Sequence, residues 1–214
     1  MAPKRRKQKI VICIAGMTGC GKSTTAKRLA KKYGLRYFSG GGALKVLAIA
    51  AGYKPGVSGW WTTEEGLRFH QQRMTDPQFD RKVDEELLKE AKRGNVILDS
   101  WTMPWLLKRG FKIWLEASPE ERAKRLAERD GISLKAAFDV LREKDEKSQA
   151  IYKKYYGFTL GEDFSPFNIV LDTNELNVNE VLDTLCMVIN RLYITKKLNP
   201  YLSLTYLTRT HDMI

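Results

Sequence analysis

A glycine-rich segment near the start of the chain has the residue types and the spacing that bind phosphate. The segment "GMTGCGKS", residues 16–23, has the pattern G-x-x-x-x-G-K-[ST] and stands between a predicted strand and a predicted helix, as this motif requires. Its glycines allow backbone N–H groups to surround a phosphate, and the start of the helix adds positive potential. Lys22 can reach the outer phosphate oxygens, and Ser23 can ligate Mg²⁺. We therefore expect this loop to bind nucleotide phosphates.

Asp99 and its neighbour help to distinguish the three classes of protein that carry such a loop, which are switches, motors and kinases. The sequence lacks the guanine-selecting pattern Asn-Lys-x-Asp of the switches. Motors need an apolar strand that ends in Asp-Glu, because the glutamate prepares a water for attack. Here "NVILDS" supplies Asp99 but places Ser100 where that glutamate would stand. Asp99 can support Mg²⁺, with a strand-end cap as the alternative, and the pattern favours a kinase.

Three arginines lie on one face of a helix predicted from residue 118 onward. Arg122, Arg125 and Arg129 are three and four residues apart, which places their side chains together. A kinase needs mobile cations and closing segments that exclude water from the transferred phosphate. We expect Arg125 and Arg129 to contact the nucleotide. The alternative is an ordinary solvated face on which these arginines pair with neighbouring glutamates.

Five short runs that are rich in β-branched or aromatic residues predict buried strands. They cover residues 9–15, 35–39, 95–99, 111–116 and 167–172. Most are apolar on both faces, as parallel strands covered by helices require, and helical patterns alternate with them. Two intervals are longer than a strand–helix connection needs. We expect residues 40–94 to form an insertion that binds the phosphate acceptor, and residues 120–166 to form the lid region.

The composition fits one α/β domain, expected over residues 9–191, with a basic segment before it. The chain has 214 residues, with 37 Lys and Arg against 25 Asp and Glu, which gives a formal charge of +12. Such a surplus attracts nucleotides, RNA or acidic membranes without choosing among them. Residues 1–8 are expected to be a disordered basic arm, with RNA contact as the alternative. No function is assigned to residues 192–214.

No apolar run approaches the roughly 20 residues that a membrane-spanning helix needs. No secretory signal precedes the first predicted strand. We expect a protein of the cytoplasm that acts as a monomer and does not bind membranes.

Several segments together resemble the archaeal-type cytidylate kinases, a branch of the nucleoside monophosphate kinases. The resemblance covers about residues 9–190. It rests on the phosphate-binding loop and on "LRYFSGGGALK", "DPQFDRKVD", "VILD", "LEASPEERAKRLAERDGIS", "YKKYYGF" and "DFSPFNIVLDT". It implies a P-loop kinase fold, with a five-stranded parallel sheet in the order 2-3-1-4-5 and with helical monophosphate-binding and lid insertions. The implied activity is ATP- and Mg²⁺-dependent phosphorylation of CMP or dCMP.

The resemblance also implies roles for individual residues. Lys22 would be catalytic, as we expect of Arg125 and Arg129 from their helix face, and Ser23 and, through water, Asp99 would hold Mg²⁺. Ser39, Gly41 and Lys45 would lie nearest the acceptor, and we expect Asp99 and Trp101 to lie there as well. The phosphates of ATP would be held by Gly16, Met17, Thr18, Gly19, Cys20, Gly21, Lys22, Ser23 and Thr24. Transfer to a phosphate oxygen, which is already anionic, needs no general base.

Three positions depart from the family pattern around the acceptor. Lys45, Trp101 and Ile151 stand where the family usually has arginine. Lysine keeps a charge but loses the two-pronged grip on phosphate, while Trp101 could stack on a flat substrate or pack in the core. Two alternatives therefore stay open: a kinase for another monophosphate or phosphorylated metabolite, and an RNA-associated nucleotide-binding protein or slow ATPase.

Overall fold

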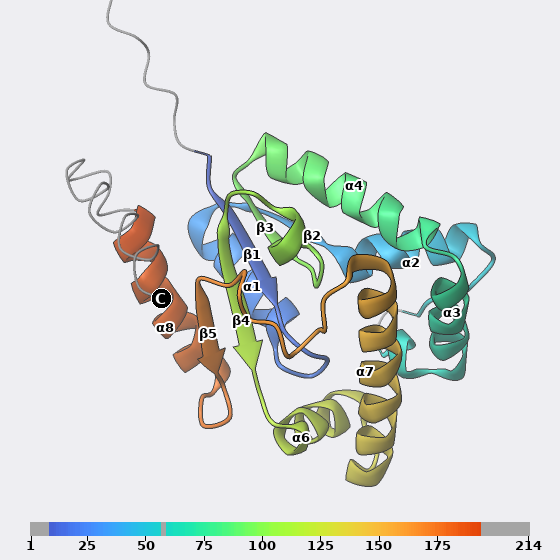
Figure 1. Ribbon diagram of the computed structural model, residues 1–214. Helices are drawn as coiled ribbons and strands as arrows, with labels where there is room; N and C mark the ends of the chain where they lie inside the picture. Colours follow the sequence, from blue (N-terminus) through green and yellow to red (C-terminus); the bar gives the residue numbers. More distant parts are fainter. Residues whose placement is uncertain (1–8, 57–58, 194–214) are drawn as a thin grey trace, which may run out of the picture. The chain divides into compact units, whose positions relative to one another are not determined.

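A five-stranded parallel sheet forms the centre of the computed structural model, which describes residues 9–56 and 59–193 (Figure 1). The strands are β1 (Val11–Ala15), β2 (Arg36–Ser39), β3 (Val96–Asp99), β4 (Phe111–Glu116) and β5 (Ile169–Asp172). Their order is β2-β3-β1-β4-β5, and every neighbouring pair is parallel. The predicted strands and the predicted order 2-3-1-4-5 are confirmed. The predictions for residues 1–8 and for residues 194–214 lie outside the described residues.

The order of the strands explains where a ligand can bind. β1 lies between β3 and β4, and the strand order reverses there: β2 and β3 lie on one side of β1, and β4 and β5 on the other. In open parallel sheets a crevice forms there, at the carboxyl ends of the strands. The strand interiors are apolar, and Ile12, Cys13 and Ile14 of β1 are fully buried. The phosphate-binding loop follows β1 directly and therefore lies at this crevice.

Eight α-helices and a short 3₁₀-helix are found among the described residues. They are α1 (Lys22–Tyr33), α2 (Gly40–Ala50), η1 (Trp60–Thr62), α3 (Glu64–Thr75), α4 (Gln78–Arg93), α5 (Met103–Leu106), α6 (Pro119–Asp130), α7 (Leu134–Tyr156) and α8 (Val178–Tyr193). α6 begins as the sequence predicts, because Ser118 Oγ accepts the Glu121 N–H. None of these helices is both long and apolar enough to cross a membrane.

The first long interval folds as a helical insertion made of α2, η1, α3 and α4. The N-cap of α3 is Thr63, whose hydroxyl accepts the Gly66 N–H. The preceding residue, Thr62, is the last of η1. The second long interval contains α6 and α7. The 23-residue helix α7 packs along α3, so the two intervals meet there (Figure 1).

The chain divides into two compact units, residues 1–175 and 176–214. In the second unit, Asn177 Oδ1 accepts the N–H of Glu180 at the start of α8, and Glu180 Oε2 accepts the N–H of Asn177. This reciprocal pair is a capping box. All residues of the candidate site described below belong to the first unit.

Candidate functional site

Two glycines of the phosphate-binding loop occupy places where no other residue fits. Gly16 has a φ of +150°, and a Cβ there would lie 2.5 Å from both Cys20 Sγ and the Leu115 carbonyl oxygen. Gly19 has a φ of +86°, and a Cβ there would lie 2.8 Å from the carbonyl oxygen of Arg122. Both backbone conformations favour glycine strongly. The loop is therefore pressed closely against β4 and α6.

The first turn of α1 places Lys22 and Ser23 beside the end of β3. Gly21 caps this helix without a side-chain hydrogen bond, so the first-turn N–H groups face the crevice as donors. Ser23 Oγ donates to Asp99 Oδ2 at 2.5 Å, and the hydroxyl of Tyr37 donates to the same oxygen at 3.0 Å. Burial, and then the Asp99 charge, raise the pKa of Tyr37. The Tyr37 hydroxyl therefore stays protonated and remains a donor.

Ser23 and Asp99 offer the oxygen donors that Mg²⁺ prefers. Mg²⁺ is usually held by one or two protein oxygens together with phosphate oxygens and water. Asp99 ends β3, where the sheet register pairs it with Ile14 of β1 and with Ser39 of β2. The pair fits a magnesium ion that arrives with nucleotide phosphates. Within residues 9–56 and 59–193, no group of three or more His, Cys, Asp or Glu side chains could hold a metal ion.

Arg122 is the arginine of α6 that touches the phosphate-binding loop. Its Nη1 donates to the carbonyl oxygen of Thr18 at 3.1 Å and to Asp145 Oδ2 on α7 at 2.6 Å. The side chain is buried, and Asp145 balances its charge. Because both contacts are to protein groups, Arg122 supports the loop from behind. The spacing of the three arginines did not reveal which one would do this.

Arg125 and Arg129, the two arginines expected at the nucleotide, make other contacts. Arg125 donates to the hydroxyl of Thr173 at 3.1 Å and to its carbonyl oxygen at 2.6 Å. Arg129 donates to both carboxylate oxygens of Asp130 at 2.7 Å, and half of its side chain is exposed. Their contact with a nucleotide stays a prediction, which requires both side chains to leave these partners.

The residues expected at the acceptor gather where β2 passes into α2. Ser39 caps α2, because its Oγ accepts the Gly42 N–H at 3.2 Å, and Gly41 lies in the first turn. Lys45, one turn further along, donates to the carbonyl oxygen of Gly56 at 2.9 Å. Burial lowers the pKa of Lys45. The start of α2 therefore adds a second helix N-terminus near Asp99, which favours another anionic group.

Trp101 lies against the phosphate-binding loop. Its Nε1 donates to the Gly16 carbonyl oxygen at 2.6 Å. The Lys22 ammonium stands over the indole ring, 5.2 Å from its centroid. The ring of Tyr152 meets the indole edge-on, with centroids 5.6 Å apart. Trp101 thus joins the loop to α7.

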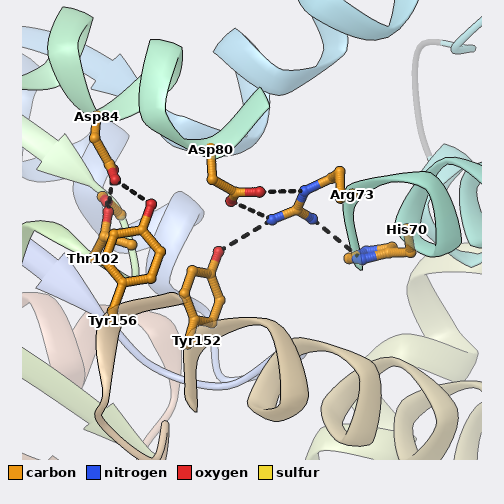
Figure 2. Close-up of polar contacts among 8 residues, drawn as sticks. His70, Arg73, Asp80, Asp84, Thr102, Tyr152 and Tyr156 are labelled. Atoms are coloured by element: carbon orange, nitrogen blue, oxygen red, sulfur yellow. Dashed lines mark hydrogen bonds and ion pairs between the residues drawn. The ribbon is translucent and has the colours of Figure 1, made fainter. Parts of the chain in front are cut away.

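A buried polar network joins α3 and α4 to α7 (Figure 2). Arg73 donates to both carboxylate oxygens of Asp80, at 3.1 and 2.6 Å, and to the hydroxyl of Tyr152 at 3.3 Å. Its Nη1 lies 3.2 Å from His70 Nδ1. Arginine can only donate, so Nδ1 accepts and His70 Nε2 carries the proton. Burial, and then the Arg73 charge, hold the pKa of His70 well below its usual value, so the imidazole stays neutral.

A second part of the network surrounds Asp84 on α4 (Figure 2). The hydroxyl of Thr102 donates to Asp84 Oδ1 at 2.5 Å, and the Tyr156 hydroxyl donates to Oδ2. Burial raises the pKa of Asp84 to about 6. Because Tyr152 and Tyr156 are one turn apart on α7, the two parts of the network fix the end of this helix against α3 and α4.

Lys144 is a buried cation on the same helix. Lys144 is 8 % exposed, and its Nζ lies 5.8 Å from the ring centroid of Trp61. Burial, and then the charge of Lys22, lower the pKa of Lys144 to about 7. One turn further along, Ser148 Oγ is buried without a hydrogen-bond partner among the described residues. The same is true of His70 Nε2. The Ser148 hydroxyl and the His70 Nε2–H are therefore buried donors near the cation Lys144.

The sequence analysis did not single out Arg73, Asp80, Asp84 and Lys144. Lys144 lies seven residues, or about two helical turns, before Ile151 and therefore on the same face of α7. A search of that face for a cation could have found it. The contact between Arg73 and Tyr152 spans 79 residues, and no local spacing predicts it.

The family model of the cytidylate kinase-like family matches residues 11–175. The chain belongs to this family. It is 33 % identical over 177 residues to a cytidylate kinase of Ignicoccus hospitalis, covering 82 % of this chain and 96 % of that protein. It is also 33 % identical over 193 residues to a cytidylate kinase of Pyrobaculum aerophilum, covering 87 % of this chain and 98 % of the relative. The family expected from the sequence motifs is confirmed, and with it a kinase.

Solved structures of other kinases share the fold of this cytidylate kinase-like chain. A shikimate kinase from Bacteroides thetaiotaomicron superimposes with a TM-score of 0.53 at 13 % identity, covering 86 % of this chain and 99 % of that one. A gluconokinase from Sinorhizobium meliloti gives a TM-score of 0.51 at 13 % identity, covering 90 % and 98 %. At such identities the likeness concerns the fold alone.

Proposed function

We propose that the protein transfers the terminal phosphoryl group of Mg·ATP to CMP or dCMP and forms the diphosphate. The observation that carries this proposal is the meeting of Ser23, Asp99 and Ser39 at one edge of the sheet. Ser23 belongs to the loop that fits a triphosphate, and Ser39 starts the acceptor insertion. Asp99 accepts the Ser23 hydroxyl and is the register partner of Ser39 in the sheet. Membership of the cytidylate kinase-like family supports a pyrimidine monophosphate as the acceptor.

The donor half consists of the loop and the groups around it. The N–H groups of residues 16–24 hold the phosphates, and Lys22 stabilises the migrating phosphoryl group. Ser23 and Asp99 would hold Mg²⁺, which would supply charge neutralisation at the phosphate oxygens. Arg125 and Arg129 would turn toward the nucleotide when the lid closes. Ser100, which stands where a motor has its water-activating glutamate, uses its Oγ to accept the N–H groups of Thr102 and Met103.

The acceptor half holds a monophosphate in line with the donor. Ser39 and Gly41 present the N-terminus of α2, and Lys45 supplies a cation from the same helix. Lys144 is the further cation that we place at the acceptor, because its Nζ lies 5.8 Å from the ring centroid of Trp61, whose Nε1 would lie 3.8 Å from a Cβ on Gly41. The attacking oxygen is already anionic, so position and charge suffice for transfer.

A second acceptor is the alternative that specific observations support. Ile151 is 1 % exposed and packs with Ala15, Met17 and Trp114, so no cation replaces the family's arginine at that position. Trp101 carries no charge either. The preferred acceptor could therefore be another monophosphate or a phosphorylated metabolite in place of CMP or dCMP. The RNA-associated alternative rests on residues 1–8, which lie outside the described residues, and it stays a prediction, as do the monomeric state and the cytoplasmic location.

A panel of acceptors tests the proposal. The protein is incubated with Mg·ATP and with CMP, dCMP, UMP, AMP, GMP, dephospho-CoA or 5′-hydroxyl RNA, and ADP and the phosphorylated product are followed. We expect diphosphate from CMP or dCMP at a rate well above that with the other acceptors. ADP formation that is independent of any acceptor would contradict the proposal and support the slow ATPase. Preference for another monophosphate would keep the chemistry and change the substrate.

A further inference from the structure

Trp101 stands where the family usually has an arginine. Its uncharged ring cannot form an ion pair with a phosphate. Trp101 lies two residues after Asp99, the last residue of β3, and it contacts Gly16, Lys22 and Tyr152. We propose that Trp101 is a positioning residue of the phosphate-binding loop: its N–H fixes the Gly16 carbonyl and its ring face holds the Lys22 ammonium. This inference rests on the proposed function only in taking the loop to bind Mg·ATP.

The bond to Gly16 orients the first peptide group of the loop. A loop that surrounds phosphate must turn its N–H groups inward and its carbonyl groups outward. Trp101 holds the carbonyl of Gly16 from the β3 side, at 2.6 Å. Arg122 holds the carbonyl of Thr18 from the α6 side, at 3.1 Å. Because both carbonyls are fixed by side chains, the intervening N–H groups are oriented toward the crevice before any ligand arrives.

The indole face holds the Lys22 ammonium weakly, so Lys22 stays available for a phosphate. Asp99, the carboxylate at the end of β3, already accepts the hydroxyls of Ser23 and Tyr37 at its Oδ2. The electron-rich face of an indole attracts an ammonium more weakly than a carboxylate does at close range. Lys22 is therefore held near the loop and can leave the ring for a phosphate. An arginine at position 101 would instead add a second cation beside Lys22.

Trp101 also touches the network that organises the acceptor side. The Tyr152 ring packs edge-on against the indole, and the Tyr152 hydroxyl accepts from Arg73. The indole thus has its N–H and one face engaged by groups of the loop, and it meets the Tyr152 ring at 90°. A side chain engaged in this way supports the loop.

Two substitutions and a matched control separate this role from acceptor binding. Trp101→Phe keeps a ring and removes the N–H donor, whereas Trp101→Leu removes both the donor and the aromatic face. The control is Trp105→Phe, because the Trp105 indole donates to Asp163 Oδ2 at 2.9 Å and stacks on Phe158, neither of which belongs to the phosphate-binding loop. The dissociation constant of Mg·ATP is measured by calorimetry, and kcat and KM for CMP are measured by product formation.

We expect Trp101→Phe to weaken Mg·ATP binding about three- to tenfold, as the loss of one hydrogen bond predicts. Trp101→Leu should weaken it about 10- to 100-fold, since the cation–π contact is lost as well. KM for CMP should stay near the wild-type value in both, and KM for Mg·ATP should rise in step with its dissociation constant. Trp105→Phe should leave Mg·ATP binding unchanged.

A rise in KM for CMP with unchanged Mg·ATP affinity would overturn the proposal, because that pattern marks an acceptor contact. An equal effect of Trp105→Phe would also overturn it, by attributing the loss to general packing. If the Trp101 variants do not fold, the five tryptophans are labelled with fluorine in the unaltered protein. The Trp101 signal should then respond to Mg·ATP and not to CMP alone, and the reverse response would reject the role. The calorimetry needs no acceptor, so it stays decisive even if CMP is not the substrate.

Discussion

Ser23 donates its hydroxyl to Asp99 across 2.5 Å, although 76 residues separate them in the chain. Ser23 lies in the first turn of α1 and Asp99 ends β3, and the parallel register of β1 with β3 places them together. This pair connects a local motif to a residue that the motif does not contain. Its oxygens are the proposed ligands of Mg²⁺, which makes the pair the first target for mutation.

Ser23→Ala and Asp99→Asn should each lower kcat by about two orders of magnitude, as the loss of one group that stabilises transition-state charge predicts. Both variants should also need more Mg²⁺ for half-maximal rate, because each removes a metal ligand. Ser23→Thr is the matched control, since it keeps the hydroxyl that the motif allows. The rate is measured against MgCl₂ concentration. An unchanged Mg²⁺ dependence in Ser23→Ala would place the metal elsewhere.

Lys22→Ala should abolish phosphoryl transfer while the protein stays folded. The ammonium lies over Trp101 and makes a contact that stability does not require, whereas the migrating phosphoryl group needs its charge. Lys27→Ala is the control, because Lys27 lies on the same helix with its ammonium over Tyr37. Thermal unfolding followed by circular dichroism should give similar Tm values for both variants. Near-normal turnover of Lys22→Ala would show that the active site lies elsewhere.

The rate should depend on the protonation of Lys144. Its pKa is lowered to about 7, so the side chain is charged below that pH and neutral above it. If the charged form binds the acceptor, kcat/KM for CMP falls about tenfold per pH unit above pH 7. Lys144→Arg keeps the charge and should remove this alkaline limb, whereas Lys144→Met should lower kcat/KM at every pH.

Lys147→Arg is the control for this pH profile. Lys147 is on the same helix and pairs with Glu143. Its replacement should leave the alkaline limb in place. A limb that persists in Lys144→Arg would assign the titration to another group.

The pair of Arg73 and Asp80 should make a large contribution to stability that depends on both partners. Arg73→Leu leaves a buried carboxylate without its cation and should cost about 3–5 kcal/mol of unfolding free energy. The double variant Arg73→Leu/Asp80→Leu should cost much less, because no buried charge is left unpaired. Arg93→Leu removes one of the two arginines that pair with Glu90, the other being Arg36; the Arg93 side chain is 66 % exposed, and its loss should cost less than about 1 kcal/mol.

Urea denaturation at one pH measures the three free energies. Equal costs of the Arg73 and Arg93 variants would show that burial does not govern the first pair. The burial of Arg73 among α3, α4 and α7 would then have to be revised.

Much of the fold could be predicted because its determinants are local. The apolar runs with both faces hydrophobic predict parallel strands, and serine caps such as Ser118 fix where helices begin. The spacing from Gly16 to Ser23 predicts a phosphate-binding loop, because a few glycines and one helix start suffice to build it. Asp99 could be added from its place at the end of an apolar run.

Other parts of the site could not be predicted, because they depend on contacts between distant segments. The sequence places three arginines on one face of α6, yet only the packing of that helix decides that Arg122 supports the loop while Arg125 bonds Thr173. The network of Arg73, Asp80 and Tyr152 forms only after α7 packs along α3. Periodicity shows which face of a helix is buried, but it does not show what the face meets.

The sequence by itself determined the kind of chemistry, namely a loop for nucleotide phosphates and a carboxylate for a metal, because those features are encoded within a few consecutive residues. Only the tertiary structure decided what surrounds them. It placed Trp101 on Gly16 and Lys22, and it buried Lys144 near the same site. Burial and neighbouring charge set the role of an ionisable or aromatic group, and both arise only when distant segments meet.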